Sequence, residues 1–438
     1  MGSFVPTTPS ERQQMLKTIG VGSVEELFRD VPQEMRIDGY LDLSSGKSEM
    51  ETMESVSALA EKNHVFRTCL RGAGSYRHYI PAAVKAIVNR EEFVTAYTPY
   101  QAEISQGILQ AIFEYQTMLC ELTGMDVSNA CVYDGGTAAA ESITMCRDRK
   151  RTKAYVSATT DPQVIEVMKT YCFGSDVELT VVPQKDGRTD PEALRSLLGQ
   201  DAACFYVQQP NFYGLLEEAE LLGEITHAAG AKYVMGVNPI SLAILKTPAE
   251  CGADVAVGEG QPLGLDTAFG GPYLGFMTAS SAMMRKLPGR IVGQTVDTEG
   301  EIGYVLTLSA REQHIRREKA SSNICSNEQL CAFTAAVYLS AMGEKGLRQA
   351  ATLCTSKAHY FAQQLEEKLG WKRVHPGEFF HEFVTECPDT EKALATLAKR
   401  DILGGLPVEG GILWCVTEVV TKERLDEAVA ILQEVSCG

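Results

Sequence analysis

The stretch GEGQPLGLDTAFGGPYLGF, residues 258–276, ends one apolar run, DVAVGEG (254–260), and opens another, GPYLGFMTA (271–279). Both runs are short and bounded by glycine, which predicts two buried strands joined by a glycine-rich turn. Such a turn at the end of a buried strand is a typical place for an enzyme to hold a cofactor. The turn contains no lysine.

Four more apolar runs precede this stretch, and helix-like segments separate several of them. The runs are KAYVSA (153–158), VELTVVP (177–183), AACFYVQQP (202–210) and KYVMGV (232–237). The segments between them include DPQVIEVMKTYCFG (161–174), DPEALRSLLG (190–199) and LEEAELLGEITHAAG (216–230). Continuous apolar strands separated by helices of about 10 to 15 residues predict an α/β fold with a mainly parallel sheet covered on both faces.

The rest of the chain reads mainly as helices. Residues 1–62 predict a helical arm in which SERQQMLKTIG (10–20) and SVEELFRDV (23–31) each begin at a serine. The large α/β domain is expected over residues 63–326, and residues 327–438 predict a long helix leading into a small α+β domain. Inside the large domain, apolar residues spaced three and four apart predict a helix that ends at Gly124, with Thr98 as its N-cap.

Composition narrows the classes of function. The 438 residues carry a formal net charge of −17, which argues against binding to nucleic acid or to an anionic membrane. No apolar run reaches the length of about 20 residues that a transmembrane helix needs, and the first residues lack the apolar core of a signal peptide, so we expect a cytoplasmic protein. The 13 cysteines are nowhere spaced as Cys-x-x-Cys, so no metal site is indicated.

The run NACVYDGGTAAAESITMCR (129–147) places Gly135, Gly136 and Thr137 between a strand and a helix. Backbone N–H groups at a helix start bind anions such as phosphate, although a tight turn explains the same glycines equally well. The order of this run, after a long helix and before an alternating sheet, fits a pyridoxal-phosphate enzyme of the aminotransferase type.

That interpretation requires three further anchors: a lysine for the Schiff base, a carboxylate facing the pyridine nitrogen, and a flat side chain stacked on the ring. Asn238 stands where the carboxylate belongs, and none of residues 159–161 is aromatic. The turn after DVAVGEG offers no lysine, and we expect Lys246 and Lys286 to point to solvent. An intact site for the cofactor is therefore not expected in this chain.

Several long motifs in the chain are too specific to arise by chance. They are RGAGSYRHYIP (71–81), FVTAYTPYQAEISQGILQAIFEYQTMLCELTGMDVSNA (93–130), YDGGTAAAE (133–141), GADVAVGEGQPLG (252–264), LPGRIVG (287–293) and LTLSAREQHIRREKASSNIC (306–325). These motifs resemble the glycine decarboxylase P-protein family of the glycine cleavage system, and the length and the opening of the chain resemble the alpha chains of its split bacterial form. The likeness spans nearly the whole chain.

The resemblance implies the pyridoxal-phosphate-dependent transferase fold of type I and an α2β2 assembly. It implies that a homologous beta chain holds the pyridoxal phosphate on a lysine, and that the complex decarboxylates glycine and transfers the aminomethyl group to the lipoyl arm of H-protein. Related sequences often have histidine where this chain has Asp161 and aspartate where it has Asn238. Both departures suit a subunit that does not bind the ring.

The resemblance assigns no catalytic residue to this chain itself, but the chain is expected to help close a site on its partner. The candidates lie in two motif loops and are Arg71, Ser75, Arg77, His78 and Tyr79 in the first, and Tyr97, Tyr100 and Gln101 in the second. Tyr97 and Tyr100 are favoured, because tyrosines can wall a carboxylate pocket and exclude water. For each residue an ordinary core, interface or surface role is the alternative.

A basic run, REQHIRREKASSNIC (311–325), has two interpretations. It is either a solvated face or a cluster that orders the subunit interface and the nearby phosphate cup, the turn formed by Gly135, Gly136 and Thr137. Two other functions stay open for the chain as a whole. One is a self-sufficient pyridoxal-phosphate aminotransferase or lyase that uses Lys246 or Lys286. The other is a homologue that stabilises the beta chain and does not contact the substrate.

Overall fold

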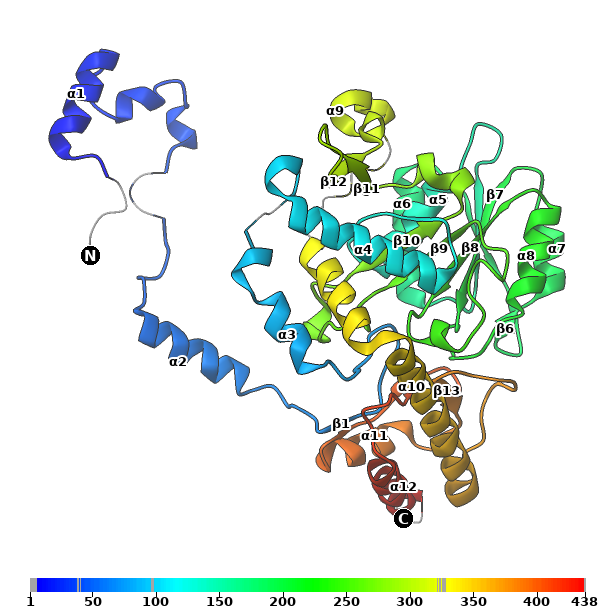
Figure 1. Ribbon diagram of the computed structural model, residues 1–438. Helices are drawn as coiled ribbons and strands as arrows, with labels where there is room; N and C mark the ends of the chain where they lie inside the picture. Colours follow the sequence, from blue (N-terminus) through cyan, green and yellow to red (C-terminus); the bar gives the residue numbers. More distant parts are fainter. Residues whose placement is uncertain are drawn as a thin grey trace. The chain divides into compact units, whose positions relative to one another are not determined.

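The computed structural model describes residues 6–37, 39, 41–95, 98–320, 322, 324 and 328–436 (Figure 1). By its internal contacts the chain divides into two units, Met1–Val65 and Phe66–Gly438. The division that we expect after residues 62 and 326 stays a prediction. No helix among the described residues is both long and apolar enough to cross a membrane.

The first unit contains two α-helices with no buried side chains, α1 (Pro9–Ile19) and α2 (Glu49–Ala60). Thr8, not Ser10, is the N-cap of α1, because it forms a capping box with Glu11, and Pro9 suits the first helical position. The predicted helix over residues 23–31 is wrong in type: only a short 3-10 helix, Glu25–Phe28, forms there, and no side chain caps its first turn.

The second unit is built on a seven-stranded sheet in the order β2-β10-β9-β8-β7-β3-β4. These strands are β2 (Val127–Ser128), β10 (Gly275–Ala279), β9 (Val255–Glu259), β8 (Lys232–Val237), β7 (Ala202–Gln209), β3 (Lys153–Ser157) and β4 (Leu179–Val182). The five strands from β9 to β4 are parallel, and β10 runs antiparallel to β9. The predicted strands and the mainly parallel sheet are thus confirmed.

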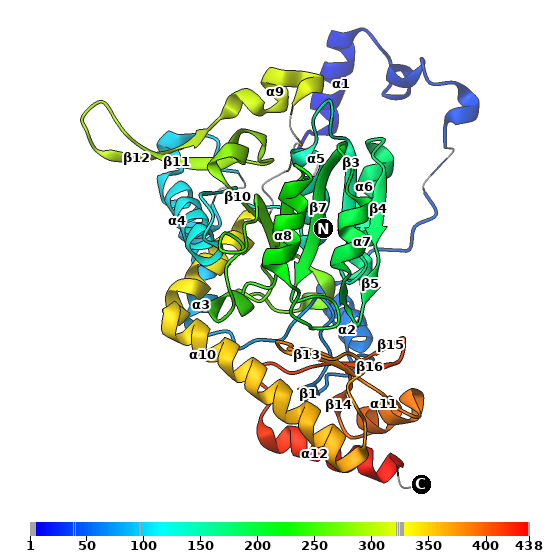
Figure 2. The ribbon, with the colours of Figure 1, turned by 90° about the vertical axis from the view of Figure 1, so that its right-hand side faces the viewer.

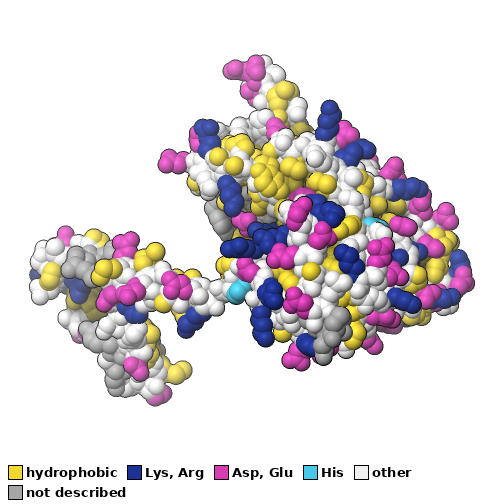
Figure 3. Space-filling model, turned by 90° about the horizontal axis from the view of Figure 1, so that it is seen from below, with side chains coloured by type: hydrophobic (Ala, Val, Ile, Leu, Met, Phe, Trp, Pro, Cys, Tyr) yellow, Lys and Arg dark blue, Asp and Glu magenta, His cyan; other side chains and the backbone are white. Residues whose placement is uncertain are grey.

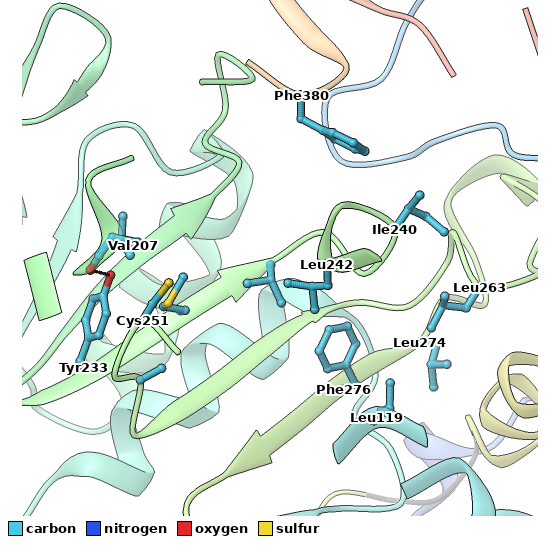
Figure 4. Close-up of a cluster of buried hydrophobic side chains, with 14 of the residues drawn as sticks. Leu119, Val207, Tyr233, Ile240, Leu242, Cys251, Leu263, Leu274, Phe276 and Phe380 are labelled. Carbon is cyan, nitrogen blue, oxygen red and sulfur yellow. Dashed lines mark hydrogen bonds between the residues drawn. The ribbon is translucent and has the colours of Figure 1, made fainter. Parts of the chain in front are cut away.

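Helices cover both faces of this sheet (Figures 1 and 2). One face packs against α5 (Gly135–Cys146) and α6 (Pro162–Gly174), in a core that includes Ile143, Met168 and Val257. The opposite core joins α4 (Gln106–Thr123), α7 (Pro191–Leu197), α8 (Ala219–Ala228) and the first half of α10 (Gln329–Leu369). In that core, Phe276 of β10 lies beside Leu119 of α4 (Figure 4).

Helix α4 confirms the predicted apolar stripe but not its predicted start. Ile108, Ile112, Tyr115 and Leu119 are buried, and Gly124 ends the helix in the left-handed conformation at φ 71°. The helix begins at Gln106, after Ser105, because the preceding backbone forms a separate 3-10 turn over Ala102–Ile104. Thr98 is therefore not its cap.

The C-terminal part packs a three-stranded antiparallel sheet against helices. The sheet contains β13 (Glu382–Thr385), β16 (Gly411–Cys415) and β15 (Leu406–Val408), and the helices are α11 (Thr390–Lys399), α12 (Lys422–Ser436) and the end of α10. Helix α10 is kinked at Gly343. The core of the C-terminal part is built around Trp414, Phe383 and Phe361.

Shorter elements connect these parts. They are β1 (Thr68–Cys69) paired with β14 (Ile402–Leu403), the pair β5 (Gln184–Lys185) and β6 (Arg188–Thr189), α3 (Ala82–Val88), the hairpin β11 (Ile291–Val296) and β12 (Ile302–Thr307), and α9 (Gln313–Arg316). On the face seen in Figure 3, acidic and basic side chains are interspersed and do not separate by sign. On this face the net negative charge of the chain does not form a uniformly acidic surface.

Gly275 begins β10, where the sheet backbone passes very close to the start of α5. A Cβ on Gly275 would lie 2.3 Å from the carbonyl oxygen of Asp134. Gly275 also exchanges two backbone hydrogen bonds with Val132, at 2.8 and 2.9 Å. The glycine is thus needed for close approach of two backbones that cannot easily separate.

We predict that Gly275→Ala lowers the midpoint of thermal unfolding, because the added methyl group meets main-chain atoms; overpacking of this kind costs about 1–3 kcal/mol. Gly107→Ala is the matched control, since a Cβ there meets nothing within 4 Å. Gly107 lies in α4, so alanine should raise helix stability by up to about 1 kcal/mol. Equal midpoints for the two variants in a calorimetric scan would contradict this account of β10.

Candidate functional site

A cavity of about 440 Å³ lies at the carboxyl ends of the parallel strands. The strand-end positions singled out in the sequence meet there: Asp161 after β3, Asn238 after β8 and Pro262 after β9. Gly135 and Gly136 at the start of α5 form another part of the wall, and the loop of residues 73–76 and β13 complete it. This is the edge of an α/β sheet where ligands usually bind.

The start of α5 already faces negative charge from the chain itself. Asp134 is its N-cap, and the Asp134 Oδ1 atom accepts a hydrogen bond from the Thr137 N–H at 2.7 Å. The Gly135 N–H donates to Glu259 Oε2 at 2.9 Å. A carboxylate thus lies where the N–H groups and the dipole of the helix would attract an anion.

Glu259, the last residue of β9, is a junction for three segments. Its Oε1 atom accepts hydrogen bonds from the N–H groups of Gln261 at 2.8 Å and Leu274 at 3.0 Å, in addition to the bond from Gly135. Burial nevertheless raises the pKa of Glu259 to about 7, because desolvation outweighs the three backbone donors. The side chain joins the end of β9 to the approach of β10 and to the start of α5.

Glu382 of β13 plays a similar part for the loop of residues 73–76. It accepts hydrogen bonds from the Ala73 N–H at 2.7 Å and the Tyr76 hydroxyl at 2.8 Å. Burial raises the pKa of Glu382 to about 7. Asp161 accepts from the Gln163 N–H at 2.8 Å as the N-cap of α6, and burial raises its pKa as well.

The residues of this cavity do not fit pyridoxal phosphate. Four carboxylates, those of Asp134, Asp161, Glu259 and Glu382, line it, and no lysine or arginine is among its described lining residues. A phosphate would meet these carboxyl groups without any cationic partner among the described lining residues. Tyr206 also lies across β8, since a Cβ on Gly236 would be 1.9 Å from the Tyr206 hydroxyl oxygen.

The two lysines considered for a Schiff base lie elsewhere. Lys246 pairs with Glu220 at 2.7 Å on the surface, and Lys286 donates to the Arg147 carbonyl oxygen at 3.3 Å. Neither residue lines the cavity. A self-sufficient site built on either of them is not supported.

The first motif loop is held mainly by contacts within the chain. Arg71 donates to the carbonyl oxygens of Gly404 and Gly405 at 3.2 and 2.9 Å, and buried His78 contacts Glu418 at 2.7 Å. Ser75 lines the cavity and hydrogen-bonds to Tyr273 at 2.7 Å. Arg77 and Tyr79 are exposed. These contacts favour structural roles for Arg71 and His78.

Of the second motif loop, Tyr97 lies outside the described residues, whereas Tyr100 and Gln101 are exposed. Tyr100 lies under the guanidinium group of Arg290, 4.5 Å from the ring centre, and Arg290 also donates to its hydroxyl. Tyr100 and Arg290 line a second cavity of about 660 Å³, together with Glu312 and His314. This cavity joins the second loop to the start of the basic run.

Two arginines of the basic run lie beside the C-terminal half of α5. Arg311 and Arg316 line a third cavity with Arg147 and Glu141, at the C-terminal half of α5, whereas the cup residues begin that helix. The length of the helix, about 16 Å, separates its two ends. Arg311 donates to the carbonyl oxygens of Leu308, Leu287 and Gly289, so its guanidinium group fixes backbone. An effect of the basic run on the subunit interface or on the cup stays a prediction.

The sequence analysis missed Glu259, Glu382 and His381. Glu259 carries a readable signal, because it is a lone carboxylate that ends an apolar strand at the carboxyl edge of a parallel sheet. Glu382 and His381 lie about 120 residues farther along the chain in the C-terminal sheet. No local sequence pattern predicts that this sheet forms a wall of the cavity.

We predict that Glu382→Gln gains stability relative to the wild type as pH rises from about 4.5 to 7. In that range the folded chain retains a proton on Glu382 that the unfolded chain has lost, so rising pH favours unfolding of the wild type, whereas glutamine does not titrate. The relative gain should approach the order of 3 kcal/mol. Thermal unfolding across this range measures it.

Glu250→Gln provides a control of opposite sign. The Thr247 N–H lowers the pKa of the exposed Glu250, so this variant should lose relative stability as pH rises. A difference between Glu382→Gln and the wild type that does not vary with pH would contradict the buried, raised titration of Glu382.

Comparisons with known proteins agree across the full length of the chain. The family described as glycine cleavage system P-protein matches residues 2–432. A probable glycine dehydrogenase (decarboxylating) subunit 1 from Desulfitobacterium hafniense is 46% identical, over 99% of this chain and 100% of that protein. The protein of the same description from Syntrophomonas wolfei subsp. wolfei is 48% identical, over 98% of each chain.

Solved structures give the same grouping. A crystal structure of glycine decarboxylase (P-protein) of the glycine cleavage system, in inhibitor-bound form, has a TM-score of 0.90 and 41% identity, covering 99% of this chain and 100% of that one. A sphingosine-1-phosphate lyase from Burkholderia pseudomallei, with a TM-score of 0.66, 12% identity and coverage of 92% and 93%, shares the fold alone. The fold is that of the type I pyridoxal-phosphate-dependent enzymes, and the chain belongs to the glycine cleavage system P-protein family.

Proposed function

We propose that this chain is subunit 1, the alpha chain, of glycine decarboxylase, and that it acts with a homologous beta chain. The complex would decarboxylate glycine and transfer the remaining aminomethyl group to the lipoyl arm of H-protein. Near-complete coverage of relatives described as subunit 1 supports this assignment. An α2β2 assembly in the cytoplasm is part of the proposal.

The beta chain is proposed to hold the pyridoxal phosphate. One observation carries this division of labour: the cavity at the strand ends of this chain is lined by four carboxylates, and Glu259 accepts the Gly135 N–H that would face a phosphate. A lysine, a ring-facing carboxylate after β8 and cationic phosphate ligands are lacking among the described lining residues. These features support the proposal that another chain holds the cofactor.

This chain is proposed to contribute side chains that enclose the partner's site. Tyr100 is the best-supported candidate, because it is 59% exposed and Arg290 fixes its ring from one side. Closing the site with an aromatic side chain excludes water from a carboxylate that must lose its charge as CO₂ leaves. Tyr97, Gln101, Ser75, Arg77 and Tyr79 stay candidates for the same surface.

Two alternatives make different demands. A self-sufficient aminotransferase or lyase needs a lysine in the cavity, and the positions of Lys246 and Lys286 do not provide one. A homologue that only stabilises the beta chain would leave catalysis insensitive to its own exposed aromatic residues. The reconstituted complex distinguishes both alternatives from the proposal.

The assignment is tested by exchange of glycine carboxyl carbon with bicarbonate in the presence of lipoylated H-protein. We expect exchange only when this chain and subunit 2 are both present. Exchange by this chain alone would favour a self-sufficient enzyme. Full exchange by subunit 2 alone would show that this chain is dispensable for catalysis.

We predict that Tyr100→Ala lowers the exchange rate of the complex by about tenfold or more, since it removes an aromatic wall, whereas Tyr100→Phe keeps the wall and loses less. Tyr360→Phe and Tyr360→Ala are matched controls. Tyr360 also has a cation over its ring, Lys422 at 4.7 Å, and a hydroxyl bound to a neighbour, Asp426, but it lies in the C-terminal part. If Tyr100→Ala exchanged as fast as Tyr360→Ala, with the complex intact by gel filtration, Tyr100 would have no part in catalysis.

A further inference from the structure

The cavity that does not suit an anion has the properties of a site for a cation. Asp134, Asp161, Glu259 and Glu382 line it, and the described lining residues include no positively charged side chain. A carboxylate offers about four acceptor positions. Glu259 uses three and Glu382 two toward described residues, so capacity for further donors remains.

An independent observation points to a missing ligand. His381 of the C-terminal sheet is 2% exposed and lines the cavity, and neither of its ring nitrogens has a hydrogen-bond partner among the described residues. Burial lowers its pKa to about 3, so the ring is neutral and has one nitrogen that accepts. Buried polar atoms rarely stay unpaired, so a donor from a bound molecule is the expected partner.

The unpaired amide nitrogen of Asn238 indicates what the other end of the ligand carries. Asn238 Oδ1 accepts from the Ile240 N–H at 2.9 Å, which fixes the orientation of the amide. The buried Nδ2 atom has no partner among the described residues, although Asn238 lines the cavity. An amide nitrogen donates, so the ligand should carry an acceptor such as a hydroxyl oxygen in addition to its donor.

The spacing of the carboxylates distinguishes an organic cation from a metal ion. A bound metal needs several ligand atoms close together. Among the described residues, the one group of three or more potential ligands within 4.8 Å of one another is His78, Cys354 and Glu418, which does not include any of the four cavity carboxylates. Aromatic walls from Tyr76, Tyr206 and Tyr273 suit an ammonium group, since ring faces attract cations.

We propose that this cavity binds a small amino alcohol: an uncharged carbon chain with a primary ammonium group at one end and a hydroxyl group at the other. The ammonium group donates to one of the cavity carboxylates and to His381, and the hydroxyl oxygen accepts from Asn238. An amino acid is excluded by its own carboxylate. Cation binding would also relieve the desolvated negative charge that raises the pKa values of Asp161, Glu259 and Glu382.

Calorimetric titration of the purified full-length chain tests the proposal without any assay of glycine turnover, so its outcome is separate from that of the proposed function. The chain is used alone because amines would react with the aldehyde cofactor of a partner. Ethanolamine is the probe, and we expect binding at one site per chain. Ethylamine, which lacks the hydroxyl, should bind several-fold more weakly, and glycine and inorganic phosphate should not bind measurably.

Asp161→Asn removes one charge and keeps the helix cap, because asparagine caps helices as well as aspartate does. It should weaken ethanolamine binding by about tenfold or more. Asp190→Asn is the matched control: Asp190 caps α7 by accepting from Glu192 and Ala193, and it does not line the cavity. This control should bind ethanolamine as the wild type does.

Three results would overturn the proposal. The first is the lack of binding heat and of any rise in unfolding temperature at ethanolamine concentrations up to about 10 mM. A bound ligand would stabilise the folded chain and raise that temperature. The second is an unchanged affinity in Asp161→Asn. The third is tighter binding of phosphate or glycine than of ethanolamine, which would assign the cavity to anions or amino acids.

Discussion

The carboxylate of Glu259 is the junction on which the ligand-binding edge of the sheet depends. It accepts N–H groups from Gly135, Gln261 and Leu274 and so connects the end of β9 with the first turn of α5 and with the chain entering β10. The N–H groups of a helix start at such an edge are suited to a phosphate. Here a side chain of the same strand supplies the negative charge, so the edge is complete without an anionic ligand.

Other carboxylates of the chain accept hydrogen bonds around the cavity in the same way as Glu259. Asp134 and Asp161 cap α5 and α6, and Glu382 fixes the loop of residues 73–76 by its bonds to Ala73 and Tyr76. Each carboxylate satisfies backbone donors that would otherwise be buried and unpaired, which stabilises the local fold. Together they leave a pocket of negative charge whose desolvation raises several pKa values.

Periodicity and strand-bounding glycines predict most of the large domain, because buried parallel strands and amphipathic helices carry strong local signals. Strands β3, β7 and β8 lie where the apolar runs predict them. Two helix starts were predicted wrongly. Helix α4 begins after Ser105 and not after Thr98, and the segment after Ser23 forms only a short 3-10 helix without a side-chain cap. The missing lysine was readable from the turn itself, but the wall formed by His381 and Glu382 depends on tertiary packing between distant segments.

The central claim, that this chain keeps the fold but not the cofactor, is tested most directly by locating the cofactor in the assembled complex. Borohydride reduction of the complex of subunits 1 and 2 fixes pyridoxal phosphate to its lysine, and mass spectrometry of the digested chains finds the modified peptide. The account predicts the added mass on one lysine of subunit 2 and on no lysine of this chain. A modified peptide containing Lys246, Lys286 or any other lysine of this chain would contradict it.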